Sequence, residues 1–410
     1  FRSVNEFLSV DAVNASSVYN GGAYQLTETF GGINPWDVFF NVNDDHAQRF
    51  GYDYEENINY LGGFGQLEYA KDSFSAFFQG SVSTQSHLRT EYLSVQNEGQ
   101  SEESEKVNKP GFNVKAGAAY NINSSNVVFA NAGYYSRQPF HSDLFVDDRN
   151  SNQLNPFVEG NQKITGLEAG YKFLGDKVSA NFNLYHTTWD NKIDYSSRDT
   201  DNNGQADEFT QTSPLKQVHM GVELEVFTRF ADGLNINGFI SVGDWKYDGN
   251  ITTRTSDDTG AVISQGATSY IDGVKIGQAA QFTAGISADY EVLPRLKVGA
   301  NWNQYDNLYG NTDFNGAEFE TENNRGAIQL PSYDTVDAGV SYKWLLGKND
   351  QNSLQFRLNI NNIFDEVYIE NSRDNIHVEA GDEQWKGVNL DNGVRLGYGR
   401  TWNVSMRLNF

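Results

Sequence analysis

In the stretch Leu354-Gln-Phe-Arg-Leu-Asn-Ile360, an apolar residue alternates with a polar one at every step. Successive side chains of a β-strand point to opposite faces, so this period of two predicts a strand with one apolar and one polar face. The same alternation recurs at residues 112–120, 178–184, 282–290, 336–344 and 402–410. The chain is therefore predicted to be all-β. A soluble β-sandwich and a membrane barrel both produce this pattern, so alternation alone leaves both open.

The composition also favours strands. The chain of 410 residues contains 27 Phe, 22 Tyr and only 7 Pro, and aromatic residues are enriched in β-strands whereas proline is depleted. Mean hydropathy is −0.59, and no stretch approaches the roughly 20 apolar residues of a membrane-spanning helix. A membrane barrel is not excluded by these values, because its alternating faces cancel in any window average.

Charge and cysteine content exclude several classes of function. The formal net charge is −24 and no basic patch is visible, which argues against a nucleic-acid partner. Without cysteine the chain has no disulfides, thiol catalysis or thiolate metal sites. The chain opens on Phe1 and lacks a charged-then-apolar signal segment, so we expect either a processed protein or a piece of a longer one.

The lengths of the links between predicted strands separate barrel from sandwich. Short and long links alternate along the chain. The short links are residues 70–73, 121–125, 174–177, 229–233, 292–295 and 347–352. The long links are residues 94–111, 137–163, 196–214, 249–275, 309–331 and 370–392. This asymmetry is typical of outer-membrane barrels, with short periplasmic turns and long extracellular loops, and it predicts a transmembrane antiparallel up-and-down β-barrel.

Aromatic residues recur where the strands descend into the short turns, and a ring of aromatics at one level is typical of a membrane interface. They are Tyr69, Tyr120, Tyr171, Phe173, Tyr290, Tyr342, Trp344 and Phe410. About thirteen strands follow Gly51, an odd number that suggests a barrel fragment, since bacterial single-chain barrels have even counts. Residues 1–50 are accordingly assigned to an extracellular loop region, or to the top of an earlier strand, and residues 51–410 to the C-terminal portion of the barrel.

Several motifs carry a family resemblance. The segment Leu358-Asn-Ile-Asn-Asn-Ile-Phe-Asp-Glu-Val-Tyr368 is similar to the LNVxNLFDxxY penultimate strand of TonB-dependent outer-membrane receptors. Asn155-Pro-Phe-Val-Glu-Gly-Asn-Gln-Lys163 with Leu167-Glu-Ala-Gly-Tyr-Lys172 resembles their NPxLKPEK…ExGYK signature, with Val158-Glu-Gly160 in place of Leu-Lys-Pro. Further matches are residues 63–69, 129–137, 221–225, 240–245 and 329–333. The chain resembles the subgroup that carries a carboxypeptidase-regulatory-like domain before the plug.

The resemblance implies about the last 13 of a probable 22 strands, in the outer membrane of a Gram-negative bacterium. It also implies active uptake of a scarce nutrient, with a plug domain inside the barrel that TonB and its inner-membrane motor pull from below. The implied ligand is a metal chelate, vitamin, glycan or peptide, and a surface lipoprotein is a further candidate partner. Two alternatives stay open: a passive substrate-selective porin complete at this length, and a secreted all-β glycan-binding or adhesion module.

The sequence contains no nucleophile elbow, zinc motif or phosphate loop, and its six histidines are scattered, so the chain is interpreted as a non-enzyme. Aromatic residues of the predicted loops, with one arginine, are the candidate ligand contacts; the alternative for each is packing between loops. They are Trp36, Phe39, Phe40, Tyr135, Arg137, Phe140, Phe145 and Trp385. The loops are strongly acidic, which disfavours a highly anionic chelate.

One predicted loop has the oxygen spacing of a calcium site. In Asp199-Thr-Asp-Asn-Asn-Gly-Gln-Ala-Asp207, acidic or amide side chains stand at positions 1, 3, 5 and 9, with glycine at position 6. The ligands would be Asp199, Asp201, Asn203, Asp207 and the carbonyl of Gln205. Position 12, where a bidentate glutamate is expected, is Thr210. The alternative is an ordinary Asx- and Gly-rich turn. No other cofactor is required.

Overall fold

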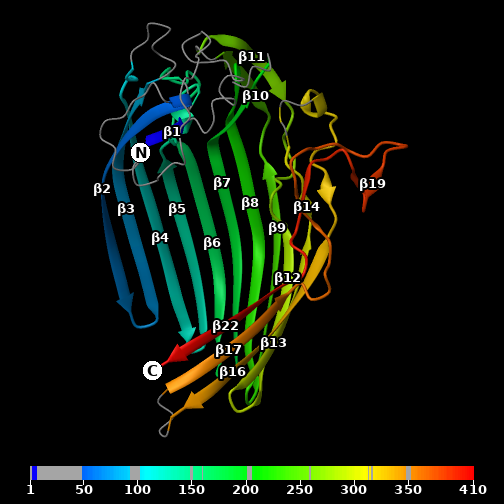
Figure 1. Ribbon diagram of the computed structural model, residues 1–410. Coiled ribbons are helices and arrows are strands. Elements are labelled where there is room, and N and C mark those ends of the chain that lie inside the picture. The colour runs from blue at the N-terminus through cyan, green and yellow to red at the C-terminus, as the bar shows by residue number, and fades with distance from the viewer. Residues whose placement is uncertain are drawn as a thin grey trace.

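The computed structural model describes residues 2–6, 49–92, 102–147, 151–158, 160–200, 206–257, 260–312, 314, 317–347 and 352–410. These residues form one large antiparallel sheet with smaller hairpins at one end (Figure 1). The sheet consists of β1 (Arg2–Glu6), β2 (Arg49–Lys71), β3 (Phe74–Glu91), β4 (Val107–Asn123), β5 (Asn126–Arg137), β6 (Gln162–Leu174), β7 (Val178–Arg198), β8 (Glu208–Ala231), β9 (Leu234–Tyr247), β12 (Phe282–Leu293), β13 (Leu296–Asp306), β16 (Tyr333–Leu346), β17 (Asn352–Asn361) and β22 (Thr401–Asn409), with β10 (Ile251–Asp257) and β11 (Val262–Ser269) branching from it.

The strands follow one another in sequence order, each antiparallel to the last, so the topology is up-and-down as predicted. Thirteen strands of the main path begin at or after Arg49, in agreement with the number expected from the alternation. β1 pairs with β2, and β22 ends the opposite edge; among the described strands no pairing closes one edge onto the other. The sheet is strongly curved (Figure 1).

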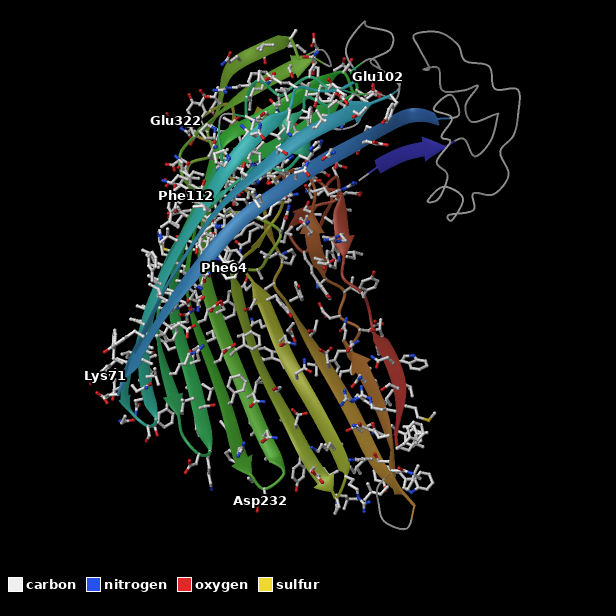
Figure 2. The ribbon with its side chains drawn as sticks, turned by 90° about the vertical axis from the view of Figure 1, so that its left-hand side faces the viewer. Phe64, Lys71, Glu102, Phe112, Asp232 and Glu322 are labelled. Atoms are coloured by element: carbon white, nitrogen blue, oxygen red, sulfur yellow. The ribbon has the colours of Figure 1, made fainter. Side chains whose placement is uncertain are left out.

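The two ends of the sheet differ as the link lengths predict. Turns of a few residues join β2 to β3, β4 to β5, β6 to β7, β8 to β9 and β12 to β13, all at one end. Figure 2 shows Lys71 and Asp232 at this end, and Glu102 and Glu322 at the end with the long connections. Left-handed backbone closes several of these turns, with φ of 50° at Asp72 and 74° at Gly233.

The faces of the sheet differ in polarity. The outer face exposes large apolar side chains along successive strands, whereas polar and charged side chains line the inner face. Outward-facing and exposed are Phe78, Val82, Phe112, Val114, Leu184, Leu224, Ile240, Ile286, Val340, Trp344, Phe356, Val404 and Met406. An exposed apolar surface of this extent is rare in a soluble monomer and suits contact with lipid.

Glycines of the inner face lie beneath aromatic rings from the neighbouring strand. A Cβ added to Gly117, Gly170, Gly221 or Gly285 would fall closer than 3.0 Å to a ring. The covering rings are Phe77, Phe129, Tyr185 and Phe239 respectively, and each is the cross-strand partner of its glycine. Each ring can lie flat against the wall only because glycine has no side chain there.

Several of the predicted long links are partly strand, and two of them contain the most strand residues. The link at 196–214 is shorter than predicted, because β7 continues to Arg198 and β8 begins at Glu208. The link at 249–275 contains the hairpin β10–β11, and β10 also pairs with the upper part of β8. The upper part of β8 and β10 are rich in threonine, a β-branched residue that favours strands. Their packing against other loops buries Leu215, Tyr247, Ile251, Ile271, Val274, Phe314 and Phe319.

The motif at residues 358–368 forms the corner that follows β17. Asn362 has left-handed backbone (φ 50°), its amide donates to Asp337 Oδ1 at 2.7 Å, and its side chain bonds the backbone of Glu366. The motif ends at Tyr368, whose ring stacks on that of Tyr333, the last residue of the matched segment 329–333, with ring centroids 4.0 Å apart. The two motifs therefore meet in space. No helix among the described residues is long and apolar enough to cross a membrane.

Candidate ligand site on the inner wall

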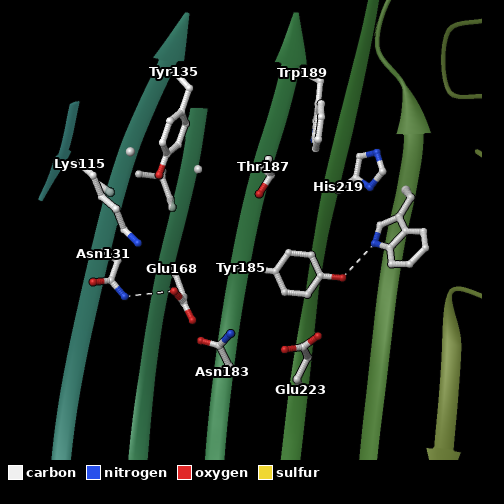
Figure 3. Close-up of a pocket in the computed structure, with 15 residues that line it drawn as sticks. Lys115, Asn131, Tyr135, Glu168, Asn183, Tyr185, Thr187, Trp189, His219 and Glu223 are labelled. Carbon is white, nitrogen blue, oxygen red and sulfur yellow. Dashed lines mark hydrogen bonds between the residues drawn. The ribbon is translucent and has the colours of Figure 1, made fainter. Parts of the chain in front are cut away.

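A cavity of about 490 Å³ opens on the inner face of β4 to β9 (Figure 3). Strand parity places its polar and aromatic side chains there, because these residues share the face opposite to the apolar one. The polar, charged and aromatic side chains that line the cavity include Lys115, Asn131, Tyr135, Glu168, Asn183, Tyr185, Trp189, His219, Glu223 and Trp245.

An aromatic cluster forms one side of the cavity. Trp245 Nε1 donates a hydrogen bond to Tyr185 Oη at 2.9 Å (Figure 3). The ring of His219 stacks on Trp245, with centroids 5.4 Å apart, and Trp189 lies 6.2 Å from His219 on the other side. Pairing between strands brings these rings together, since His219 is the partner of Trp245 across β8 and β9, and Tyr185 is the partner of Gly221.

Polar groups form the other side. Asn131 Nδ2 donates to Glu168 Oε2 at 3.1 Å. Asn183 Oδ1 and His219 Nε2 have no hydrogen-bond partner within the described part of the chain. With Lys115 as the one cation and Glu168 and Glu223 as the carboxylates, the lining carries more negative than positive charge. The cavity can therefore stack a planar or ring-shaped ligand and hydrogen-bond its edge.

Three of the predicted ligand residues lie at or above this cavity. Tyr135 lines it directly, and its ring covers Gly133. Arg137 follows on the same face of β5, donates from Nη1 to Gln162 Oε1 at 2.7 Å, and lies over the Phe140 ring at 3.8 Å. Phe140 itself is 61% exposed, so its ring is accessible.

The other predicted ligand residues are dispersed. Phe145 is fully buried against His141, at 4.9 Å between ring centroids, so a ligand reaches it only if its loop moves. Trp385 belongs to the separate short strand β19 (Gln384–Trp385; Figure 1). The Lys386 ammonium lies 4.8 Å from the centre of the Trp385 ring. Trp36, Phe39 and Phe40 lie outside the described residues.

The predicted calcium loop is described only at its ends. Asp201, Asn203 and Gln205 fall outside the described residues. Asp199, Thr200 and Asp207 lie in the connection between β7 and β8. Asp207 accepts hydrogen bonds there from the amide and the hydroxyl of Thr200, at 2.8 and 2.5 Å. Within the described ranges, no three or more acidic or histidine side chains are grouped to hold a metal ion. Calcium binding at this loop stays a prediction.

The sequence did not single out the aromatic cluster of the cavity. The sequence did contain an indication of this cluster. Tyr185 and Trp189 are aromatic residues on the otherwise polar face that contains Asn181, Asn183 and Thr187. An aromatic residue on the water-facing side of an alternating strand is a candidate contact. Its assembly with His219 and Trp245 depends on the pairing register, which one sequence does not specify.

The comparisons identify the family. Residues 4–363 match the family "TonB dependent receptor-like, beta-barrel". The match covers most of the chain, so the chain belongs to this family of outer-membrane receptor barrels, as the motifs implied. Members of the family are transporters rather than enzymes, in agreement with the absence of a catalytic motif. No curated protein matches the chain.

Solved structures share the fold at low identity. The chain is similar to the ferric-catecholate import receptor Fiu from Escherichia coli K12, at 15% identity over 95% of this chain and 48% of that one, with a TM-score of 0.57. The siderophore receptor PiuA from Acinetobacter baumannii is 17% identical over 87% and 44%, with a TM-score of 0.59. The copper transporter OprC is 15% identical over 86% and 47%, with a TM-score of 0.56. The chain thus spans about half the length of these receptors.

Proposed function

We propose that the chain is the C-terminal part of a receptor in the outer membrane of a Gram-negative bacterium, which takes up a scarce nutrient by TonB-dependent active transport. The observation that carries this proposal is the sheet itself. It has an apolar outer face, a polar inner face and long connections at only one end, in a chain of the TonB-dependent receptor family. This combination suits a wall between lipid and a wet interior.

The cavity on β4 to β9 is the proposed contact for the imported ligand. Its aromatic cluster and its hydrogen-bonding groups face the interior, along the path that a ligand takes through a barrel. Its two carboxylates and single lysine favour a neutral ligand over a strongly anionic chelate, because an anion would lie in an unfavourable field. Arg137, Phe140 and Tyr135 are the proposed contacts nearer the mouth.

The proposed partners follow from the family. They are a plug domain inside the barrel, TonB with its inner-membrane motor, and a small-molecule, glycan or peptide ligand; a surface lipoprotein is a further candidate. The proposed complete barrel has 22 strands. The N-terminal carboxypeptidase-regulatory-like domain remains an expectation from the motif resemblance.

The test compares growth of three strains of the source bacterium: wild type, one lacking the receptor gene, and one lacking TonB. Each is grown with one limiting nutrient, supplied in turn as a ferric catecholate, ferric citrate, haem, cobalamin or an oligosaccharide. Active uptake predicts at least one nutrient whose use requires both genes. Re-expression of the receptor with Tyr185→Ala and Trp245→Ala is expected to weaken use of that nutrient while leaving the protein in the outer-membrane fraction.

Two outcomes would reject the proposal. Growth that needs the receptor gene but not TonB would indicate a passive porin. Recovery of the native protein in the medium, without detergent, would indicate a secreted binding module.

A further inference from the structure

Two buried histidines meet where the loop between β5 and β6 lies against the upper end of β3. His87, on the inner face of β3, is 0% exposed; His141, which precedes the short 3₁₀ turn η2 (Ser142–Leu144), is 7% exposed. Their Nδ1 atoms are 3.1 Å apart. β3 begins at Phe74 beside the short turn, and a tilted strand crosses the bilayer in about 9–11 residues, so His87 lies above the segment that contacts lipid.

The contact requires at least one neutral imidazole. A hydrogen bond between two Nδ1 atoms needs one protonated and one bare nitrogen. Neither Nε2 atom has a hydrogen-bond partner in the part of the chain that the structure describes. One added proton therefore places an unsolvated charge in a buried site, and a second sets two N–H groups against each other.

The surroundings place positive charge close to the pair. The Arg89 guanidinium, on the same face of β3, lies 4.1 Å from the Tyr54 ring and 5.7 Å from the Phe145 ring. Burial lowers the pKa of His141 to about 4, and His87 and Arg89 add to the effect. Burial, with Lys109, also lowers the pKa of His87. The charged and titratable groups around the pair are Tyr54 and Glu56 on β2, Arg89 and Glu91 on β3, Glu102 and Glu103 beside β3, Lys109 on β4, Arg137 on β5 and Asp143 in η2.

Side chains of the loop contact β3 and the segment beside it at several described points. Besides the histidine pair, Gln138 Nε2 donates to Ser83 Oγ at 2.9 Å, and Asn152 Nδ2 donates to the Glu102 carbonyl at 2.6 Å. Phe145 packs directly against His141. The histidine pair is therefore one of the contacts that hold the loop, next to the most deeply buried ring of the loop.

We propose that His87 and His141 form a proton-sensitive latch, which keeps the β5–β6 loop closed on β3 at neutral pH and releases it in acid. In the open loop both imidazoles are solvated and have the ordinary histidine pKa of 6.5. Between that value and the pKa of about 4 of buried His141, the open form binds more protons, so acid favours opening by about tenfold per pH unit. His87, whose pKa burial also lowers, adds to the effect in the same direction. Above that range the pair gives no pH dependence. Opening exposes Phe145 and shifts Phe140 at the mouth of the barrel. The latch depends on neither the identity of the ligand nor energised transport.

Hydrogen–deuterium exchange of the full-length receptor in detergent tests the latch, at about pH 7.5 and about pH 4.5 with labelling times corrected for the intrinsic rate. Peptides covering residues 140–147 are expected to exchange at least tenfold faster in acid, while the turn between β8 and β9 changes little. In the variant His87→Gln/His141→Gln the acid response of the loop is expected to disappear. His377→Gln, in another loop, is the matched control and is expected to retain the response.

Equal protection of residues 140–147 at both pH values would overturn the latch, as would an acid response that survives in the double variant. If the double variant does not fold, the wild-type titration decides: a response beginning below about pH 4 would assign the effect to carboxylates. Protection of the loop by zinc ions near neutral pH, absent from His141→Gln, would show that the pair binds metal and would also reject the proposal.

Discussion

The stack of Tyr305, Tyr333 and Tyr368 provides a stability prediction that geometry alone determines. Tyr333 is the middle ring, 4.8 Å from Tyr305 and 4.0 Å from Tyr368 between centroids, with interplanar angles of 23° and 13°. We consider the replacement of each ring by leucine. Leucine retains apolar bulk but cannot stack, so each variant isolates the ring–ring contacts.

The expected losses follow from the number of contacts. An aromatic pair contributes about 0.5–1.5 kcal/mol beyond the area that it buries. Tyr333→Leu removes two pairs and is expected to cost about 1–3 kcal/mol, whereas Tyr305→Leu and Tyr368→Leu each remove one pair and cost about half as much. The outer rings, one on β13 and one in the corner before β18 (Ile369–Ser372), share Tyr333 as their partner, so the loss from mutating both is expected to depart from the sum of the two by less than the coupling across either stacked pair.

Urea unfolding of the full-length receptor in detergent micelles, followed by tryptophan fluorescence, would measure these losses. Double-mutant cycles are expected to give coupling between Tyr333 and each neighbour, and weaker coupling between Tyr305 and Tyr368, which are linked only through Tyr333. Tyr333→Leu costing no more than Tyr305→Leu would refute the reasoning. Coupling between the two outer rings as strong as that across either stacked pair would also refute it.

Three further predictions use the same unfolding assay or calorimetry. Gly221→Val is expected to lower the free energy of unfolding by about 1–3 kcal/mol, because the new Cβ would lie 2.6 Å from both the Tyr185 hydroxyl and a backbone carbonyl. Gly166→Val is the control and should be tolerated, because the atom nearest to its new Cβ is 3.9 Å away. We propose that calcium binds the loop at residues 199–207, so titration calorimetry should give heat that Asp207→Asn abolishes; no heat from the wild type would reject this. Arg325→Met is expected to lower the free energy of unfolding by less than about 1 kcal/mol, because the ion pairs of Arg325 with Glu318 and Glu379 are at the surface. Added salt should reduce this loss further, and a loss that persists in salt would contradict the prediction.

Strand identity and topology were predictable because they depend on local patterns. The alternation at residues 354–360 and the lengths of the links specify which side chains share a face and which end of the sheet carries the loops. The upper extensions of β7 and β8 were not predicted. Their alternation is weaker, and they become strands through pairing with each other and with β10, a tertiary effect.

The candidate site was predictable only in part. Residue type and the predicted loop position identified Tyr135, Arg137 and Phe140, which lie at or above the cavity. The cluster around His219 and Trp245 required the register between β8 and β9, because residues 26 positions apart become neighbours only through pairing. Phe145 was predicted as a ligand contact from its residue type, but burial against His141 gives it a packing environment instead.

The glycines beneath aromatic rings also have a consequence for how the barrel folds. If neighbouring strands paired out of step by two residues, each ring would meet a Cβ instead of a glycine, and the glycine would be left uncovered. Four such pairs, between β3 and β4, β5 and β6, β7 and β8, and β9 and β12, would each penalise a shifted alignment. Strands that enter a membrane have no water to satisfy a mispaired backbone, so correction after insertion is slow. The ring–glycine pairs would then favour the native register of these neighbouring strands before the barrel is fully inserted in the membrane.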